Sequence, residues 1–422
     1  MPRQRTEVAA QVADLLRTAR QSLGLSLAFL SRMDGTTQHL EVVESSVPLV
    51  FHDGITQRQD TSFCQAIMDG KLPAVMPDVA AFPEAMKLPA ARMPRIRSFV
   101  SVPVVLSDGT VYGTFCAAGF AADKKLSKRD RALLEVLSHA AATVIEPTVH
   151  EQARHAEIDG RIGALMASGG PVVLLQPIVE LQTGVRVGAE ALSRFPPEWN
   201  QTPDVCFADA HSIGVGHDLE VQALRRAAEH LSPIEGYVAM NVSPSTLLTP
   251  ACTDLLSGLP LDRIVLELSE HNAVEDYDDL ARTLAPLRDR GMRLAIDDVG
   301  AGFSSLRHIV VTKPDVIKLD RSIVTGLGDD PVLTVVVRSL VDLARACDAR
   351  VVAEGVETAA DAEAARGAGV DHGQGWFFGR ATAAEDLLAE YPVAARAGQE
   401  RQNVEHPAGR TSRAGLVRRK AT

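Results

Sequence analysis

Polar side chains interrupt seven apolar stretches between about residues 184 and 380 of the 422-residue chain. Each stretch has the pattern of a buried strand, and each carries a polar residue near its end: Glu190, Asn241, Glu267, Asp297 with Asp298, Lys318, Glu354 and Gln374. Five carboxylates that met at one place would repel one another, and several would be protonated unless cations compensated them. Two divalent ions together with the one lysine would balance their charge.

The ligand types indicate which ions these would be. Oxygen ligands from Asp, Glu and Asn suit Mg²⁺ or Mn²⁺ better than zinc. Two such ions about 3.5–4 Å apart are a recurring arrangement in phosphoester hydrolysis. In the run EALSR, alternation places Glu190, Leu192 and Arg194 on one face, where the arginine could bind a phosphate. A single acid in such a strand is more often part of a structural ion pair, but seven consecutive strands with ligand-type residues favour a site.

The elements that would position these residues begin at residue 171, where strand-like and helical stretches alternate. The strand-like runs are VVLLQPIVEL, VRVGAEALSRF, YVAMNVSP, RIVLELSEH, RLAIDDVG, DVIKLDRS, RVVAEGVE and HGQGWFFGR. Eight strands interleaved with helices predict an α/β barrel of modified TIM type. In such barrels the active site lies at the carboxyl ends of the strands, which is where the polar residues occur.

The first part of the chain has a different pattern. It predicts an α+β domain with an antiparallel sheet flanked by helices: a helix over 7–21, several short strands, and a hairpin turn at Asp108-Gly109. A long helix follows Ser127, and Pro147 is expected to interrupt it. The predicted organisation is a domain over 1–146, a helical connector over 147–170, the barrel over 171–395 and a basic disordered tail over 396–422.

Composition excludes several classes of protein. The chain has 43 basic and 54 acidic residues, a formal charge of −11, which disfavours a general nucleic-acid binder. Its five cysteines are scattered without a C-x-x-C pair, which argues against a disulfide framework and a cysteine zinc site. The sequence contains no run of about 18 apolar residues and no signal-peptide pattern, so we expect no membrane span and a cytoplasmic location.

Taken together, the motifs between about 171 and 390 resemble the EAL domain family of cyclic di-GMP phosphodiesterases. The resemblance rests on separate motifs along the barrel: QPI at 176–178, EALSRF at 190–195, NVSP at 241–244, ELSE at 267–270, DDVGAGFSSL at 297–306, KLD at 318–320, EGVE at 354–357 and QGWFFGR at 374–380. It implies metal-dependent hydrolysis of cyclic di-GMP to linear pGpG by in-line attack of water.

The resemblance also implies a role for each residue. Two Mg²⁺ or Mn²⁺ ions would be bound by Glu190, Asn241, Glu267, Asp297, Asp298 and Glu354, with Asp297 bridging. Lys318 would hold the attacking water, and Glu354 is also a candidate general base. Substrate contacts would come from Gln176, Leu192, Arg194 and Gln374, the last of which would also position a water. Glu270 would anchor the loop after Asp298, and Glu357 would brace the strand end that carries Glu354.

The sequence departs from the family pattern in the loop after the paired aspartates. Val299, Ala301 and Phe303 stand where the family usually has an aromatic residue, Thr and Tyr, and Ala381 replaces a usual Pro. No ligand is lost, so the enzyme is favoured over a catalytically silent cyclic di-GMP receptor or a scaffold that recruits a partner. The resemblance implies that this loop couples metal binding, substrate binding and dimerisation, so we expect Val299, Ala301 and Phe303 to affect the rate of hydrolysis and its regulation.

Residues 1–146 are similar to a GAF domain, through SFCQAIMDG, the PDV run, RSFVSVPVVLSDGTVYGTFCAAG and the long helix. The similarity implies regulation of the barrel by an unknown small ligand or signal. The apolar stripe 133–145 suggests a homodimer. Cys64 and Cys116 could be redox or ligand groups, but packing as small apolar residues is the favoured interpretation.

Overall fold

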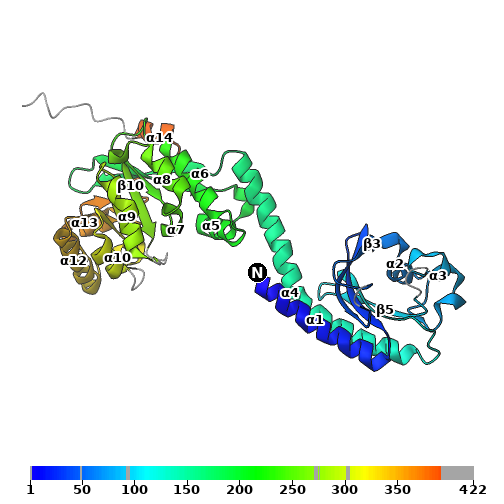
Figure 1. The fold of residues 1–422 in the computed structure, drawn as a ribbon. Coiled ribbons are helices and arrows are strands. Elements are labelled where there is room, and N and C mark those ends of the chain that lie inside the picture. Colours follow the sequence, from blue (N-terminus) through cyan, green and yellow to red (C-terminus); the bar gives the residue numbers. More distant parts are fainter. Residues whose placement is uncertain are drawn as a thin grey trace, which may run out of the picture. The chain divides into compact units, whose positions relative to one another are not determined.

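The computed structural model describes residues 2–47, 50–91, 96–269, 274, 276–300 and 305–390. It divides into two compact units, Met1–Glu157 and Ile158–Thr422, and each is described by itself (Figure 1). The predicted α+β domain followed by an α/β barrel is confirmed as a fold class.

The first unit is built on a six-stranded antiparallel sheet of order β3-β2-β1-β6-β5-β4. Its elements are α1 (Pro2–Leu23), β1 (Leu27–Met33), β2 (Thr37–Ser45), β3 (Thr56–Arg58), α2 (Phe63–Met68), β4 (Val75–Met76), α3 (Pro83–Lys87), β5 (Ser98–Val105), β6 (Val111–Gly119) and the start of α4 (Lys128–Ala167). The predicted hairpin turn joins β5 to β6, where Gly109 has a φ of 85° that favours glycine.

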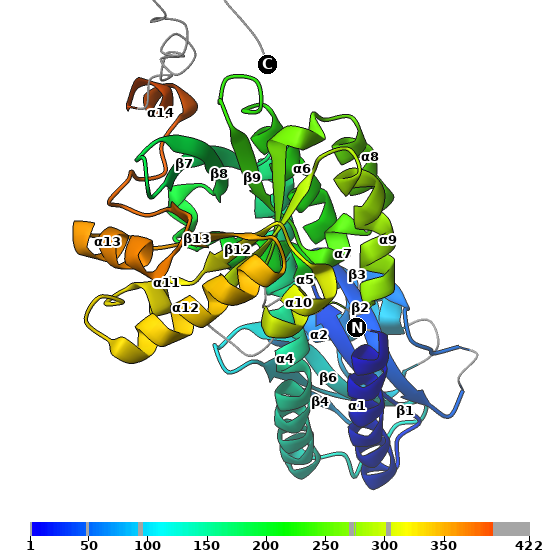
Figure 2. The ribbon, with the colours of Figure 1, turned by 90° about the vertical axis from the view of Figure 1, so that its left-hand side faces the viewer.

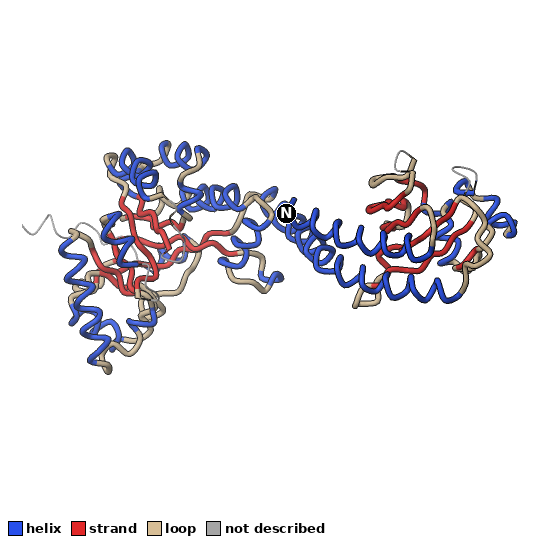
Figure 3. The backbone as a smooth tube through the Cα atoms, turned by 60° about the horizontal axis from the view of Figure 1, so that its bottom comes forward, coloured by secondary structure: helices blue, strands red, loops and turns tan. Residues whose placement is uncertain are grey.

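Helices cover both faces of this sheet because alternate strand residues are apolar on each side. Helices α1 and α4 lie along one face (Figure 3). They contribute apolar residues such as Leu16 and Leu134 to the core on that side. On the other face, Phe63 of α2 packs with Phe29 and Phe99 of the sheet. The sheet therefore has two separate apolar layers.

The predicted interruption at Pro147 is wrong, because α4 is one helix over Lys128–Ala167 with Pro147 inside it. A proline inside a helix loses one backbone hydrogen bond, and its ring crowds the carbonyl four residues earlier. The packing of α4 before Pro147, through Ile145, and after it, through Ile158, offsets this cost. The predicted stripe 133–145 is largely used within the unit, since Leu134, Ala141 and Ile145 are buried against the sheet.

Within the described part of the chain, α4 is also the one helix whose length and apolar content would allow it to cross a membrane. This is weak evidence, because core helices of soluble proteins pass the same test. Part of its apolar surface packs on the sheet, and 28% of the most apolar window of the helix is buried.

The second unit is a closed eight-stranded barrel of order β10-β11-β12-β13-β14-β7-β8-β9 (Figure 2). Its strands follow the eight predicted runs: β7 (Val172–Glu180), β8 (Arg186–Arg194), β9 (Tyr237–Asn241), β10 (Ile264–Ser269), β11 (Arg293–Val299), β12 (Val316–Leu319), β13 (Arg350–Ala353) and β14 (His372–Gly373). Strand β7 is antiparallel to both of its neighbours, and the other adjacent pairs are parallel.

Helices surround this barrel and bury its outer apolar layer. They are α5 (Pro203–Ser212), α6 (Gly216–Ala228), α7 (Pro244–Leu247), α8 (Pro250–Ser257), α9 (Tyr277–Arg288), α10 (Ser305–Thr312), α11 (Arg321–Val324), α12 (Pro331–Ala346), α13 (Ala359–Ala368) and α14 (Ala384–Glu390). A smaller apolar cluster, which includes Ile178, Val265 and Val352, fills the barrel interior. The polar residues at the strand ends lie beyond this filling.

Candidate active site

The strand register brings the predicted acids to one rim of the barrel. Glu267 of β10 pairs with Asn241, the last residue of β9, and Ser269 pairs with Asp297 of β11. Glu354 directly follows β13, and Gln374 directly follows β14. Because the parallel strands run in the same direction, these carboxyl ends meet.

Lys318 of β12 lies at the centre of the cluster and is only 1% exposed. Its Nζ lies 2.6 Å from Glu354 Oε1, 2.9 Å from Glu267 Oε2, 3.1 Å from Asp297 Oδ1 and 3.4 Å from Glu190 Oε2. One ammonium thus faces four carboxylates. A buried charge requires partners of opposite sign, and here the negative partners outnumber the positive one.

Two amides complete the surroundings of Glu190. Asn241 Nδ2 donates to Glu190 Oε1 at 2.8 Å, and Gln374 Nε2 donates to Glu190 Oε2 at 2.5 Å. Gln374 Nε2 also contacts Gln176 Oε1 at 3.1 Å. Gln374 Oε1 is buried and has no hydrogen-bond partner among the described residues. Such an oxygen is available to a ligand or a water.

Burial and mutual repulsion change the acidity of the cluster. Burial raises the pKa of Glu267 well above its usual range, and the neighbouring Glu190 charge adds to this rise. Burial also raises the pKa of Asp297, and it raises the pKa of Glu354 to about 8, against the attraction of Lys318 in both cases. These groups therefore bind protons more tightly than ordinary carboxylic acids.

Glu190 and Lys318 shift in the direction of their charged forms. Burial opposes the charge of Glu190, but the Lys318 ammonium and the two amide donors outweigh it and lower its pKa. Burial likewise opposes the charge of Lys318, yet the surrounding carboxylates raise its pKa well above the usual value. The lysine is therefore a permanent cation in this site.

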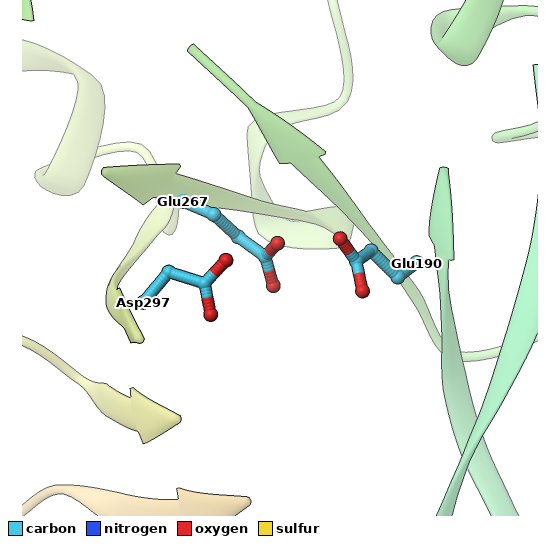
Figure 4. Close-up of side chains that lie close together, drawn as sticks. All are labelled: Glu190, Glu267 and Asp297. Atoms are coloured by element: carbon cyan, nitrogen blue, oxygen red, sulfur yellow. The ribbon is translucent and has the colours of Figure 1, made fainter. Parts of the chain in front are cut away.

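The carboxylates form two groups that share one member. Oxygens of Glu190, Glu267 and Asp297 lie within 4.8 Å of one another, as do oxygens of Asp297, Asp298 and Glu354. The side chains of the first group point toward one another from three strands (Figure 4). Asp297 belongs to both groups. This donor set of acidic oxygens with an excess of negative charge fits two adjacent divalent cations.

Local backbone geometry places the second group. Asp298 has a φ of 59°, in the left-handed region that asparagine and aspartate tolerate better than most residues. Its amide donates to Asp297 Oδ1 at 3.0 Å. Gly300 has a φ of 115°, and a Cβ there would lie 2.6 Å from the Ile323 side chain. The chain thus turns sharply after the paired aspartates.

A cavity of about 290 Å³ opens beside the cluster. Its lining residues are Gln176, Glu190, Leu192, Asp297, Arg321, Glu354, Gly355, Glu357, Gln374, Gly375 and Trp376. Of the substrate residues named from the sequence, Gln176, Leu192 and Gln374 line this cavity. Arg194 lies outside the lining, and its Nη1 donates to the carbonyl of Ser193 at 2.9 Å.

Arg321 and Trp376 also line the cavity, but they were not identified from the sequence as candidate site residues. Both could have been found from position alone, because Arg321 follows the strand end KLD and Trp376 follows Gln374 by two residues. Arg321 Nη2 lies 2.9 Å from Glu357 Oε1. Glu357, expected to brace a strand end, is therefore paired with an arginine of the cavity wall. Glu270 lies outside the described residues.

A buried glutamate supports the loop that follows Asn241. Glu220 of α6 accepts hydrogen bonds from the backbone N–H of Ser243 at 2.8 Å and from its hydroxyl at 2.9 Å. His211 Nε2 lies 2.6 Å from Glu220 Oε1. These contacts fix the start of the loop at the site, and nothing in the residue types of α6 had indicated them.

Comparisons with known proteins agree with this architecture. A family model described as an EAL domain matches residues 163–381, and one described as a GAF domain matches residues 6–146. A solved structure of the EAL enzyme Bd1971 in its cAMP- and cyclic-di-GMP-bound form has a TM-score of 0.52 at 19% identity, covering 87% of this chain and 93% of that chain. This likeness supports the fold alone.

Two curated relatives illustrate the sequence similarity. The cyclic di-GMP phosphodiesterase PdeL of Escherichia coli (strain K12) is 30% identical over 237 residues, which cover 52% of this chain and 65% of that protein. A protein of Mycobacterium tuberculosis is 34% identical over 226 residues, 50% of this chain and 36% of the relative. The match spans about a third of the length of the first curated relatives.

Proposed function

We propose that the barrel hydrolyses cyclic di-GMP to linear pGpG, because the chain belongs to the EAL domain family. The model of this family matches residues 163–381, which is more than half of the 422-residue chain. PdeL, whose name states this phosphodiesterase activity, is one of its relatives. The observation that carries the proposal is the excess of buried carboxylates around Lys318, in two groups that share Asp297. A silent receptor would not require this excess.

The residues present fit two divalent cations. Glu190, Glu267 and Asp297 would hold one, and Asp297, Asp298 and Glu354 would hold the other, with the Asn241 amide oxygen as a further ligand. Mg²⁺ or Mn²⁺ suits these oxygen donors. When bound in such a site, these ions neutralise phosphate charge and activate water.

The side chains of the protein orient and deprotonate the water. Lys318 lies within hydrogen-bond reach of Glu354 and can hold a water by donating to it. Bound cations would favour the carboxylate form of Glu354, which can then accept a proton from the water. The free Oε1 of Gln374 can accept a hydrogen bond from the same solvent. The water oxygen bonds to phosphorus as its proton passes to Glu354, the bond to the 3′ oxygen breaks, and that oxygen takes up a proton from solvent.

The cavity wall would bind the substrate. Arg321, fixed by Glu357, can donate two parallel hydrogen bonds to a phosphate. The Trp376 ring is 56% exposed in the wall and carries the Arg380 guanidinium 4.2 Å from its centre. An exposed aromatic face suits stacking with a guanine base. Gln176 and Leu192 line the same wall, whereas Arg194 would have to rotate away from Ser193 to contribute.

Product formation tests the proposal. The purified full chain is incubated with cyclic di-GMP and Mn²⁺ or Mg²⁺, and the nucleotides are separated by chromatography. We expect pGpG from the wild type and a loss of at least about a hundredfold in Glu267→Gln, since removal of a group that acts in the transition state costs several kcal/mol. The exposed Glu229→Gln is the matched control. Stoichiometric nucleotide binding without pGpG would support the receptor instead.

Regulation and assembly extend the proposal. The N-terminal unit would regulate the barrel in response to a small ligand or signal, and α4 supports a link because it contributes Leu134 to one apolar core and Ile162 to the other. A homodimer and a cytoplasmic location stay predictions. Light scattering tests the dimer, which would have a mass of about 90 kDa, twice that of the 45.1 kDa chain.

A further inference from the structure

Two cysteines meet inside the N-terminal unit. Cys64 of α2 and Cys116 of β6 are 52 residues apart in sequence, and their Sγ atoms lie 3.4 Å apart. Both are free thiols, and their exposed fractions are 2% and 0%. The pair joins two different elements, so its proximity is produced by the fold and not by chain neighbourhood.

The surroundings of the pair are polar on the sheet side. Cys116 Sγ contacts Ser101 Oγ at 3.2 Å and Thr114 Oγ1 at 3.3 Å. Thr114 in turn contacts Ser31 at 2.8 Å, and Gln38 donates to Ser31 at 2.8 Å. Both cysteines belong to an apolar core cluster, as the packing interpretation favoured from the sequence predicts. Packing alone does not explain the polar contacts of Cys116 or the contact between the two sulfur atoms.

A cavity gives one of the thiols access to small molecules. It has a volume of about 230 Å³ and is lined by Phe29, Leu40, Val50, Phe51, Ile55, Gln57, Phe63, Cys64, Ala90, Ile96 and Phe99. A water molecule occupies about 30 Å³ of liquid volume, so a molecule slightly larger than water fits easily. Cys64 lies in the wall, and Cys116 lies behind it in the sheet.

We propose that Cys64 and Cys116 form an oxidisable dithiol, a modification site at which hydrogen peroxide reaching the cavity of the N-terminal unit produces an internal disulfide. The basis is the contact of the two sulfur atoms, their polar partners and the position of Cys64 in the cavity wall. The proposal is independent of the phosphodiesterase activity, because no residue of the barrel takes part.

The chemistry balances with one peroxide. The sulfur of Cys64 attacks one peroxide oxygen, an S–O bond forms, the O–O bond breaks, and the second oxygen leaves as water after taking a proton. The sulfur of Cys116 then attacks the sulfur of Cys64. The S–S bond forms, the S–O bond breaks, and the hydroxyl leaves as a second water with the remaining thiol proton. The two sulfurs lose two electrons in total, and the peroxide gains them.

The position of Cys64 in the cavity wall, with Cys116 behind it, assigns the order of attack, and the directions of the two pKa shifts agree with it. The hydrogen bond from Cys116 is the largest cause that lowers the pKa of Cys64, to about 7, although burial opposes it. Burial raises the pKa of Cys116 well above its usual value. Since the thiolate is the nucleophile, Cys64 reacts first and Cys116 resolves the intermediate.

Closing the bond requires a small movement. A disulfide has a sulfur–sulfur distance of about 2.05 Å, so the two atoms must approach by roughly 1.4 Å. Helix α2 has only six residues and carries Phe63 next to Cys64 in the cavity wall. Oxidation would therefore tie α2 to β6 and reshape the cavity.

Thiol counting and peptide mapping test the proposal on the full chain. After a limited peroxide dose, we expect the number of thiols titrated in denaturant to fall from five to three. A cross-linked peptide containing Cys64 and Cys116, two mass units lighter than the sum of the reduced peptides, should appear and should disappear after dithiothreitol. Buried Cys206 and Cys252 provide internal controls and should stay reduced.

Variants separate the two roles. Cys116→Ser should stop at one oxidised sulfur on Cys64, seen as a gain of one or two oxygen atoms, and Cys64→Ser should lose no thiol at the same dose. The partly exposed Cys347→Ser should form the disulfide at the wild-type rate. The proposal is overturned if the wild-type chain loses thiols at Cys347 while Cys64 and Cys116 remain reduced. This readout on the wild type does not depend on how well any variant folds.

Discussion

At the scale of single residues, the site depends on the charge of Lys318. The ammonium lies within 3.4 Å of four carboxylates. Among the described residues it is the one cation that pairs with these four groups. Removing one partner of a buried ionic cluster leaves uncompensated charge, which is more costly than losing an exposed pair. The lysine therefore stabilises the fold as well as serving the proposed reaction.

Substitution of this lysine should show both roles. We expect Lys318→Ala to lower the free energy of unfolding by about 3–5 kcal/mol without added metal, and to abolish most hydrolysis. Addition of Mn²⁺ should restore stability but not activity, because the cations replace the positive charge of Lys318 and not the hydrogen bond with which it holds the water. Denaturant unfolding with and without Mn²⁺ measures this. The exposed Lys125→Ala should change neither property, and an unaltered stability of Lys318→Ala would contradict the geometry.

Trp376 provides a second test at the residue scale. If its ring stacks with a guanine base, Trp376→Ala should raise KM by about 5- to 160-fold, since stacking of a base on an aromatic ring contributes roughly 1–3 kcal/mol. The neighbouring Phe377 is also exposed but does not line the cavity. Phe377→Ala is therefore the matched control in steady-state kinetics. Equal effects of the two substitutions would count against stacking.

At the scale of elements, the carboxyl ends of the strands position the ligands, and neighbouring helices hold the loops. Glu220 of α6 connects this helix to Ser243, two residues after Asn241. We expect Glu220→Ala to lower the unfolding free energy by about 2–3 kcal/mol, because several hydrogen bonds to a buried carboxylate are lost. Cation affinity should also fall, as Asn241 loses its support.

Glu229, at the end of the same helix, is exposed and pairs only with Arg226 among the described residues. Glu229→Ala should therefore leave stability within about 0.5 kcal/mol of the wild type. Parallel denaturation curves and Mn²⁺ titrations of the two variants make the comparison. If Glu220→Ala behaved like Glu229→Ala, the loop would not depend on α6.

Much of the barrel could be predicted from the sequence, because each strand combines an apolar run with a polar end. The eight strands and the convergence of Glu190, Glu267, Asp297 and Glu354 follow from that pattern. Other features depend on contacts that no local pattern encodes. The ion pair of Arg321 with Glu357 is one example, and the continuity of α4 through Pro147 is another. Tertiary packing decides such cases.

At the scale of the whole molecule, the chain contains two compact units, each with its own apolar core. Metal ions should therefore stabilise only the barrel unit. In calorimetry we expect two unfolding transitions, one for each unit. Mn²⁺ at a hundred times its dissociation constant should increase the free energy of unfolding of the barrel by about 2.7 kcal/mol per site, and should leave the other transition unchanged. A single transition, or an equal shift of both, would show that the two units do not unfold independently.

The central claim is that two cations bind between carboxylates that share Asp297. Its most direct measurement is Mn²⁺ binding to the full chain by isothermal titration, at about pH 8.5, where the raised pKa of Glu354 no longer keeps it mostly protonated. We predict two Mn²⁺ per chain, and at most one, bound more weakly, in Asp297→Asn. Failure of the wild type to bind Mn²⁺, or unchanged binding of two ions in Asp297→Asn, would contradict the account.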